Sequence, residues 1–186
     1  MSATTKICAI NISRLWYGDP SLIAADLTGA ALATLLKDKG LHEITNIHQD
    51  TWTFEEAEAT ITKYKNQLNN KVYRVDKVLG DVDIKATIGQ YSYQEKADLM
   101  GGDSSTDGMW KRAGSTPTIE KLFIGLTEDD QYFVIPRTDV EAREATTDKA
   151  MGLPFSATEL EPKADGVASE YWFDSSIVKE AQASAS

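Results

Sequence analysis

The clearest pattern along the chain is a pair of apolar runs, separated by an acidic turn, between residues 122 and 136. Each run carries apolar side chains at both odd and even positions, as at Leu122 and Phe123. Strands with two apolar faces are buried on both sides, inside a sandwich or a barrel. Proline has no N–H to donate to a sheet, so Pro136 predicts the end of the second strand. The pattern therefore predicts a buried β-hairpin.

Strict alternation between Val82 and Ile88 predicts a half-buried strand. Its apolar residues fall on one face, and Asp83 and Lys85 fall on the other, which must meet water. Weaker alternation predicts three further strands, over residues 6–13, 138–145 and 153–160.

Two short helices are predicted. Over residues 28–40, leucines recur at i, i+3 and i+4 from Leu32, Thr28 can cap the start, and Gly40 ends the segment. Residues 94–100 allow two helical turns before a Gly-Gly pair. Both helices are too short to be the frame of the fold, so they are expected to flank a sheet.

Two long segments fit neither period. Residues 43–77 are polar and interrupted, and a structureless connection of that length is unusual inside a compact domain. We therefore expect an extended arm that contacts a neighbouring subunit. Residues 103–115 are predicted to be a mobile loop, and residues 179–186 a frayed end. The aromatic candidates for subunit contacts are Trp52, Phe54 and Tyr64 in the arm, and Trp110 in the loop.

These elements together predict a single domain over residues 1–186 that is mainly β. The expected architecture is an antiparallel β-sandwich or barrel with one or two short flanking helices and long loops or arms. A chain of 186 residues with 41% hydrophobic residues is large enough to bury such a core.

The formal net charge of −10 bears on which partners the protein can bind. Residues 1–119 carry 13 basic and 15 acidic groups, whereas residues 120–186 carry 6 and 14. Such a surface repels phosphates, so tight binding of nucleic acid is not expected. Cys8 is the single cysteine, which excludes an intramolecular disulfide, and no apolar stretch is long enough to span a bilayer. The chain is expected to be soluble and unsecreted, with no membrane contact.

Known catalytic and phosphate-binding motifs are absent from the sequence. His42 and His48 are the only histidines, and their spacing fits no closed metal site, so we expect surface residues and no metal or other cofactor. Neighbouring carboxylates such as Glu55 and Glu56 have no partner base and are expected to form a solvated face. The sequence predicts a protein that is not an enzyme.

The order of these features resembles the tail tube (major tail) proteins of long-tailed bacteriophages. The likeness covers most of the chain and consists of order and pattern rather than an active-site signature. The segments that carry it are Leu15–Pro20, the alternating strand 82–88, the helix that closes at Leu99–Gly102, residues 119–124 and 132–137, the strand around Val140, and Phe155–Pro162.

The resemblance implies a β-sandwich subunit that forms hexameric rings, which stack into a hollow tube through which DNA leaves the particle. Tubes of type VI secretion and contractile injection systems share that fold. It also implies a place in the virion tail after assembly in the host cytoplasm, and contacts with tail terminator, baseplate and tape-measure proteins. An acidic lumen would let DNA pass without tight binding.

Polar residues on strand faces are the candidates for that lumen: Asp83 and Lys85 on the alternating strand, and Glu141 and Arg143 on the strand after Pro136. The same residues could instead lie outside and serve solubility. The main alternative function is a monomeric β-sandwich binding module or another virion component, such as a head-completion or decoration protein. A small hydrolase is a weaker alternative.

Overall fold

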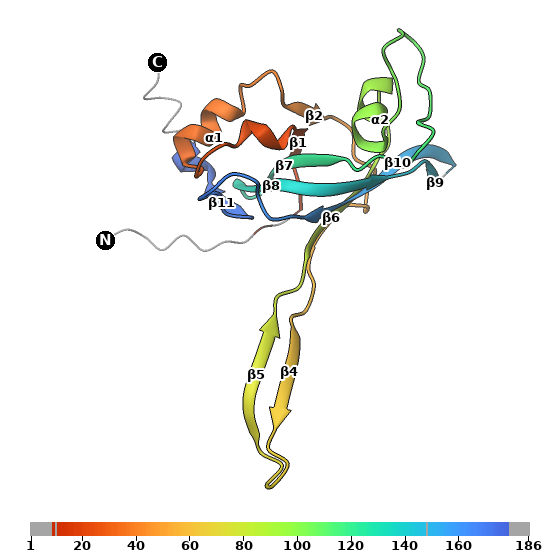
Figure 1. Cartoon of the computed structure of the whole chain (residues 1–186). Helices are drawn as coiled ribbons and strands as arrows, with labels where there is room; N and C mark the ends of the chain where they lie inside the picture. The colour runs from red at the N-terminus through yellow and green to blue at the C-terminus, as the bar shows by residue number, and fades with distance from the viewer. Residues whose placement is uncertain (1–8, 10, 148, 179–186) are drawn as a thin grey trace.

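The computed structural model describes residues 9, 11–147 and 149–178, and its body is built on an antiparallel sheet of nine strands. The sheet runs in the order β2-β1-β7-β8-β10-β6-β3, with β11 paired to β8 and β9 paired to β10 (Figure 1). Cys8 and the end at 179–186 lie outside the described residues. The strand predicted over 6–13 is described only at residues 9 and 11–13, which form no strand, because the first strand of the sheet begins at Arg14. The mainly β, antiparallel fold class is confirmed.

The strands of the sheet are β1 (Arg14–Gly18), β2 (His42–Ile44), β3 (Thr53–Glu56), β6 (Val82–Ile88), β7 (Glu120–Leu126), β8 (Gln131–Ala142), β9 (Ala145–Thr147), β10 (Ala150–Glu159) and β11 (Tyr171–Asp174). Two strands, β4 (Thr60–Lys65) and β5 (Val72–Val78), form a separate sheet. The helices with both ends among the described residues are η1 (Pro20–Leu22), α1 (Gly29–Leu35) and α2 (Tyr93–Met100), and residues 175–178 are also helical.

The β7–β8 hairpin lies at the centre, as its two apolar faces predict. On one face, Phe123 and Phe133 enter the main core together with residues of β1, β6, β10 and α2. On the other face, Leu122 and Val134 pack in a second cluster against α1. Both faces of these strands are therefore covered by apolar partners.

The predicted end of the strand at Pro136 is wrong, because β8 continues through this residue to Ala142. Lys121 pairs with Thr138 and Phe123 pairs with Ile135, so two residues of β8 face one residue of β7. Pro136 lies in this β-bulge, where its missing N–H removes no bond from the ladder. The extra residue also exchanges the two faces of β8, which turns the fully buried Thr138 toward the side that Ile135 occupies.

The first helix is shorter than the predicted 28–40. Thr28 caps α1 as expected, accepting the backbone N–H of Ala31, but α1 ends at Leu35 and tighter turns follow it. The helix α2 agrees with the prediction over 94–100, and Ser92 and Glu95 form a capping box at its start.

Candidate assembly surfaces

The most unusual feature of the molecule is the hairpin formed by β4 and β5, which projects from the body (Figure 1). Of the predicted arm 43–77, residues in β2 and β3 belong to the main sheet, so the projecting part is narrower. Its tip is closed by a turn in which Asn66 bonds the backbone of Lys71 and Asn70 bonds that of Asn66. The Asn66 side chain also accepts the N–H of Leu68 at 2.9 Å.

The hairpin holds most of the large apolar side chains that are exposed on the described part of the molecule. Among the described residues, eight of the twelve large hydrophobic side chains that are exposed lie between residues 61 and 79. Leu68 at the tip is 95% exposed, and Tyr73 is 70% exposed. An isolated two-stranded hairpin is at best marginally stable in water, and a contiguous exposed apolar surface marks an interaction site. This hairpin is therefore expected to be covered in the functional state.

Charge is also divided between the hairpin and the body. Residues 60–78 contain five basic and one acidic side chains, a net charge of +4, so the remainder of the chain carries −14. Lys63 lies opposite Val75 and Lys77 lies opposite Ile61, and directly opposed residues share a face. One face of the hairpin is thus both basic and apolar. On the other face, Arg74 pairs with Asp76 at 2.9 Å.

The aromatic residues predicted to make subunit contacts lie in three places: on the hairpin, at its root, and, for Trp110, in the loop after α2. Tyr64 lies on the hairpin and is 41% exposed. Trp52 and Phe54 pack inside the subunit against Phe133, with ring centroids 5.8 and 5.2 Å away. These two residues anchor the root of the hairpin in the body instead of forming part of the projecting surface.

Trp110 has internal partners in the loop after α2. The ammonium group of Lys96 lies 3.7 Å from the centroid of its ring, and its indole N–H donates to the carbonyl of Gly101 at 3.0 Å. Asp103 and Lys111 form a bridge across the same loop, with two backbone hydrogen bonds of 2.9 Å. The loop predicted to be mobile thus contains its own hydrogen bonds.

A polar sheet face is formed by β3, β6, β10 and the second half of β8. Lys85 lies beside Ser156, which lies beside Glu141, and Asp83 lies beside Thr158 and then Asp139 in the next row. The structure therefore brings the lumen candidates onto one face. Lys85, Glu141 and Arg143 line a shallow cavity of about 700 Å³ on it.

Asp83 on this face is held by two neighbours. The hydroxyl group of Thr158 donates to its carboxylate at 2.6 Å, and the ammonium group of Lys85 lies 3.2 Å away. Lys85, Glu141 and Arg143 are exposed. The face is polar and partly charged, and it is open to solvent at Lys85, Glu141 and Arg143, whereas Thr87 on the same face is buried.

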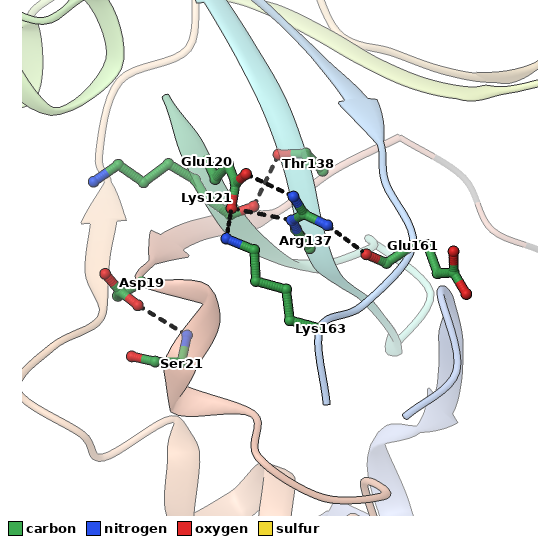
Figure 2. A network of polar contacts seen from close by, with 8 residues as sticks. All are labelled: Asp19, Ser21, Glu120, Lys121, Arg137, Thr138, Glu161 and Lys163. Atoms are coloured by element: carbon green, nitrogen blue, oxygen red, sulfur yellow. Dashed lines mark hydrogen bonds and ion pairs between the residues drawn. The ribbon is translucent and has the colours of Figure 1, made fainter. Parts of the chain in front are cut away.

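An ion network joins β7, β8 and the segment after β10 (Figure 2). The Arg137 guanidinium donates to both carboxylate oxygens of Glu120, at 2.6 and 3.0 Å, and to the carbonyl of Glu161 at 2.8 Å. Lys163 donates to Glu120 at 2.7 Å. Hydrogen bonds lower the pKa of Glu120 from 4.5 to about 2, with the larger effect from Arg137 and the smaller from Lys163. Sequence reasoning missed this site, because the pairing of Glu120 with Arg137 depends on the register of β7 and β8.

A second ion pair ties α2 to the turn after β8. The Lys96 ammonium lies 2.5 Å from Glu144, and only 10% of the Lys96 side chain is exposed. Tyr91 donates to the same carboxylate at 3.2 Å. The hydrogen bond from Lys96 lowers the pKa of Glu144. This pair fixes α2, and with it the loop that carries Trp110.

The described residues contain no group of three or more histidine, cysteine, aspartate or glutamate side chains arranged to hold a metal ion. His42 stacks on Tyr17, with ring centroids 5.4 Å apart. No helix in the described part of the chain is long and apolar enough to cross a membrane.

Comparison of the sequence with protein families finds no match, and comparison with curated proteins finds none either. The surfaces of the molecule are therefore the guide to its function.

Proposed function

We propose that this protein is a structural subunit that assembles with copies of itself into stacked rings, in the manner of a phage tail tube. The observation that carries the proposal is the projecting hairpin, which holds most of the exposed large hydrophobic side chains of the described residues. A surface of this kind on an otherwise well-packed body is suited to insertion into a neighbouring subunit.

Directional contacts support a tube in preference to a closed dimer. A hairpin on one part of a subunit that meets a different part of the next makes a heterologous contact, which closes into rings or continues as a filament. The main sheet also ends at two short strands, β2 with three residues and β3 with four. Such edges can pair with those of neighbouring copies, which would hide their free backbone groups.

The polar face of β3, β6, β10 and β8 is the proposed wall of the lumen. It carries Asp83, Asp139 and Glu141 beside Lys85 and Arg143, and its other side is covered by the main core. Carboxylates on this wall would repel phosphate, so DNA would slide through without tight binding. In this assignment the protein belongs to the virion tail, where it would contact tail terminator, baseplate and tape-measure proteins.

A monomeric binding module is the second candidate, because a single exposed hairpin could also engage one unrelated partner. A decoration or head-completion protein of a virion would use it in this way. The two candidates differ in self-association, which the purified chain can reveal directly.

The test compares the full chain with a variant in which residues 60–78 are replaced by an Asn-Gly turn. This deletion spares β3, which pairs with β6, whereas removing residues 53–72 would take a strand out of the main sheet. The proposal predicts rings or tubes for the full chain and a folded monomer for the variant, by light scattering and negative-stain microscopy. A strictly monomeric full chain at every concentration tested would contradict it.

A further inference from the structure

A groove of about 450 Å³ lies at the root of the hairpin, between the main sheet and the segment after β10. Leu79, Val82 and Leu160 are the apolar residues with long side chains in its lining, and of these Val82 is buried in the main core. Leu79 is 77% exposed and leads directly out of the hairpin. The groove is thus partly apolar and open to solvent.

Five carboxylates surround this groove: Glu56, Asp81, Glu159, Glu161 and Glu170. No lysine, arginine or histidine is found among the described residues that line it. Arg137 approaches from one side but binds the backbone carbonyl of Glu161, whose carboxylate points away from it (Figure 2). Glu170 accepts the indole N–H of Trp172. The negative charge of the groove is therefore largely uncompensated.

The hairpin has the complementary composition. Its Lys63 and Lys77 lie on one face with Ile61 and Val75, so this face combines ammonium groups with aliphatic side chains. The groove lining combines carboxylates with leucine and valine residues. Apolar contact and charge pairing can then form together, and each strengthens the other when water is excluded.

The hairpin of the same chain cannot fill this groove. Ala57 donates to the carbonyl of Asp81 at 2.9 Å, which closes the root of the hairpin, and the strands then lead away from the body (Figure 1). A Cβ atom on Gly80 would lie 1.9 Å from the carbonyl oxygen of Ala57, so the two segments that lead into and out of the hairpin are in close contact there. The occupant has to come from another molecule.

We infer that the groove receives the basic face of the hairpin from a second copy of this chain. The inference rests on the proposed function and names the two surfaces that meet in it. A nucleic acid is a poorer occupant for the hairpin, because a body with a charge of −14 repels phosphate and because Leu68, Tyr73 and Leu79 present apolar surface. Each copy offers one hairpin and one groove, so the contact repeats from copy to copy.

Charge reversal on either surface tests this inference. The groove variant carries Glu56→Lys and Glu161→Lys, both at exposed positions, and the hairpin variant carries Lys63→Glu and Lys77→Glu. A variant with Asp107→Lys and Glu128→Lys is the matched control for the groove variant, since it makes the same change in net charge at exposed positions outside the groove lining. Self-association is measured by analytical ultracentrifugation at 50 and 500 mM salt, with circular dichroism to verify folding.

Each reversed variant should associate about 100-fold more weakly than the full chain at low salt, because like charges then face each other. The chain that combines all four substitutions should recover association to within about threefold, and the control should behave as the unmodified chain does. Association of the unmodified chain should weaken with added salt.

If the groove variant associates normally while the hairpin deletion is monomeric, the hairpin docks elsewhere; the inference is then wrong and the proposed function survives. If no variant, including the unmodified chain, associates, both fail. Binding of duplex DNA by the unmodified chain, lost in the hairpin variant and measured by fluorescence anisotropy, would instead identify a nucleic-acid surface and overturn the inference.

Discussion

Replacing Leu68 by serine should separate assembly from folding. Leu68 lies at the tip of the hairpin and is 95% exposed, so its side chain makes almost no contact within the subunit. Surface substitutions without such contacts change the free energy of unfolding by less than about 0.5 kcal/mol. The isolated subunit carrying Leu68→Ser should therefore unfold at nearly the same temperature as the unmodified chain.

The expected effect on assembly is much larger. Fully burying a leucine side chain contributes about 1.5–3 kcal/mol, and each 1.4 kcal/mol is a factor of ten in affinity. If the tip is buried in a neighbour, Leu68→Ser should weaken association by roughly 10- to 100-fold. Sedimentation over a range of concentrations measures this difference.

A matched control is Met151→Ser, because Met151 is 63% exposed but lies on the body, in β10. It should leave association unchanged. If both substitutions weaken association equally, the cause is a general loss of surface hydrophobicity and not the loss of a contact at the tip. Unchanged association with Leu68→Ser would refute burial of the tip.

Three further outcomes are expected. Gly125→Ala should destabilise the subunit by about 1–3 kcal/mol in chemical denaturation, because a Cβ atom would lie 2.1 Å from the Phe133 ring. The pKa of Glu120 is lowered from 4.5 to about 2, so ionised Glu120 stabilises the folded subunit above pH 4.5, and this stabilisation is lost as the pH falls toward 2. Glu120→Gln should therefore reduce the dependence of the unfolding free energy on pH over that range. Asp83→Lys with Glu141→Lys should leave tubes intact but make them retain DNA at low salt; assembled tubes that show no gain in retention would remove both residues from the lumen.

The local pattern of apolar and polar residues was sufficient to predict a strand where at least one face of that strand is buried among apolar side chains. The β7–β8 hairpin was predicted because burial of both faces requires apolar residues at successive positions. The strand β6 was predicted because burial of one face requires them at alternate positions. Pro136 misled the prediction, because a proline signals the end of a strand unless a bulge accommodates it. The bulge depends on the pairing of β7 with β8, which no local pattern contains.

Long-range packing explains the other differences. Trp52 and Phe54 were expected on a projecting arm, yet they contact Phe133, and Phe54 also contacts Trp172, at distant places in the chain. Their apolar character is visible in the sequence, but the identity of the surface that covers them is not. The same limit applies to Glu120 and Arg137, whose pairing needs the register of two strands.

One feature of the sequence could have predicted the bounds of the hairpin. Five of the 19 basic residues of the chain fall between residues 60 and 78, with one acidic residue among them, in a chain with a net charge of −10. A local reversal of charge in an acidic protein indicates a segment with a role of its own. Its projection from the body follows from the pairing of β3 with β6, which leaves the connection between them outside the sheet.

The central claim is that the projecting hairpin drives self-assembly, and the most direct measurement is the mass of the particles in solution. Light scattering after size-exclusion chromatography should give ring- or tube-sized particles for the unmodified chain. The variant with an Asn-Gly turn in place of residues 60–78 should give a monomer with an unchanged circular dichroism signal from the main sheet. Assemblies of equal mass from both chains would contradict the claim.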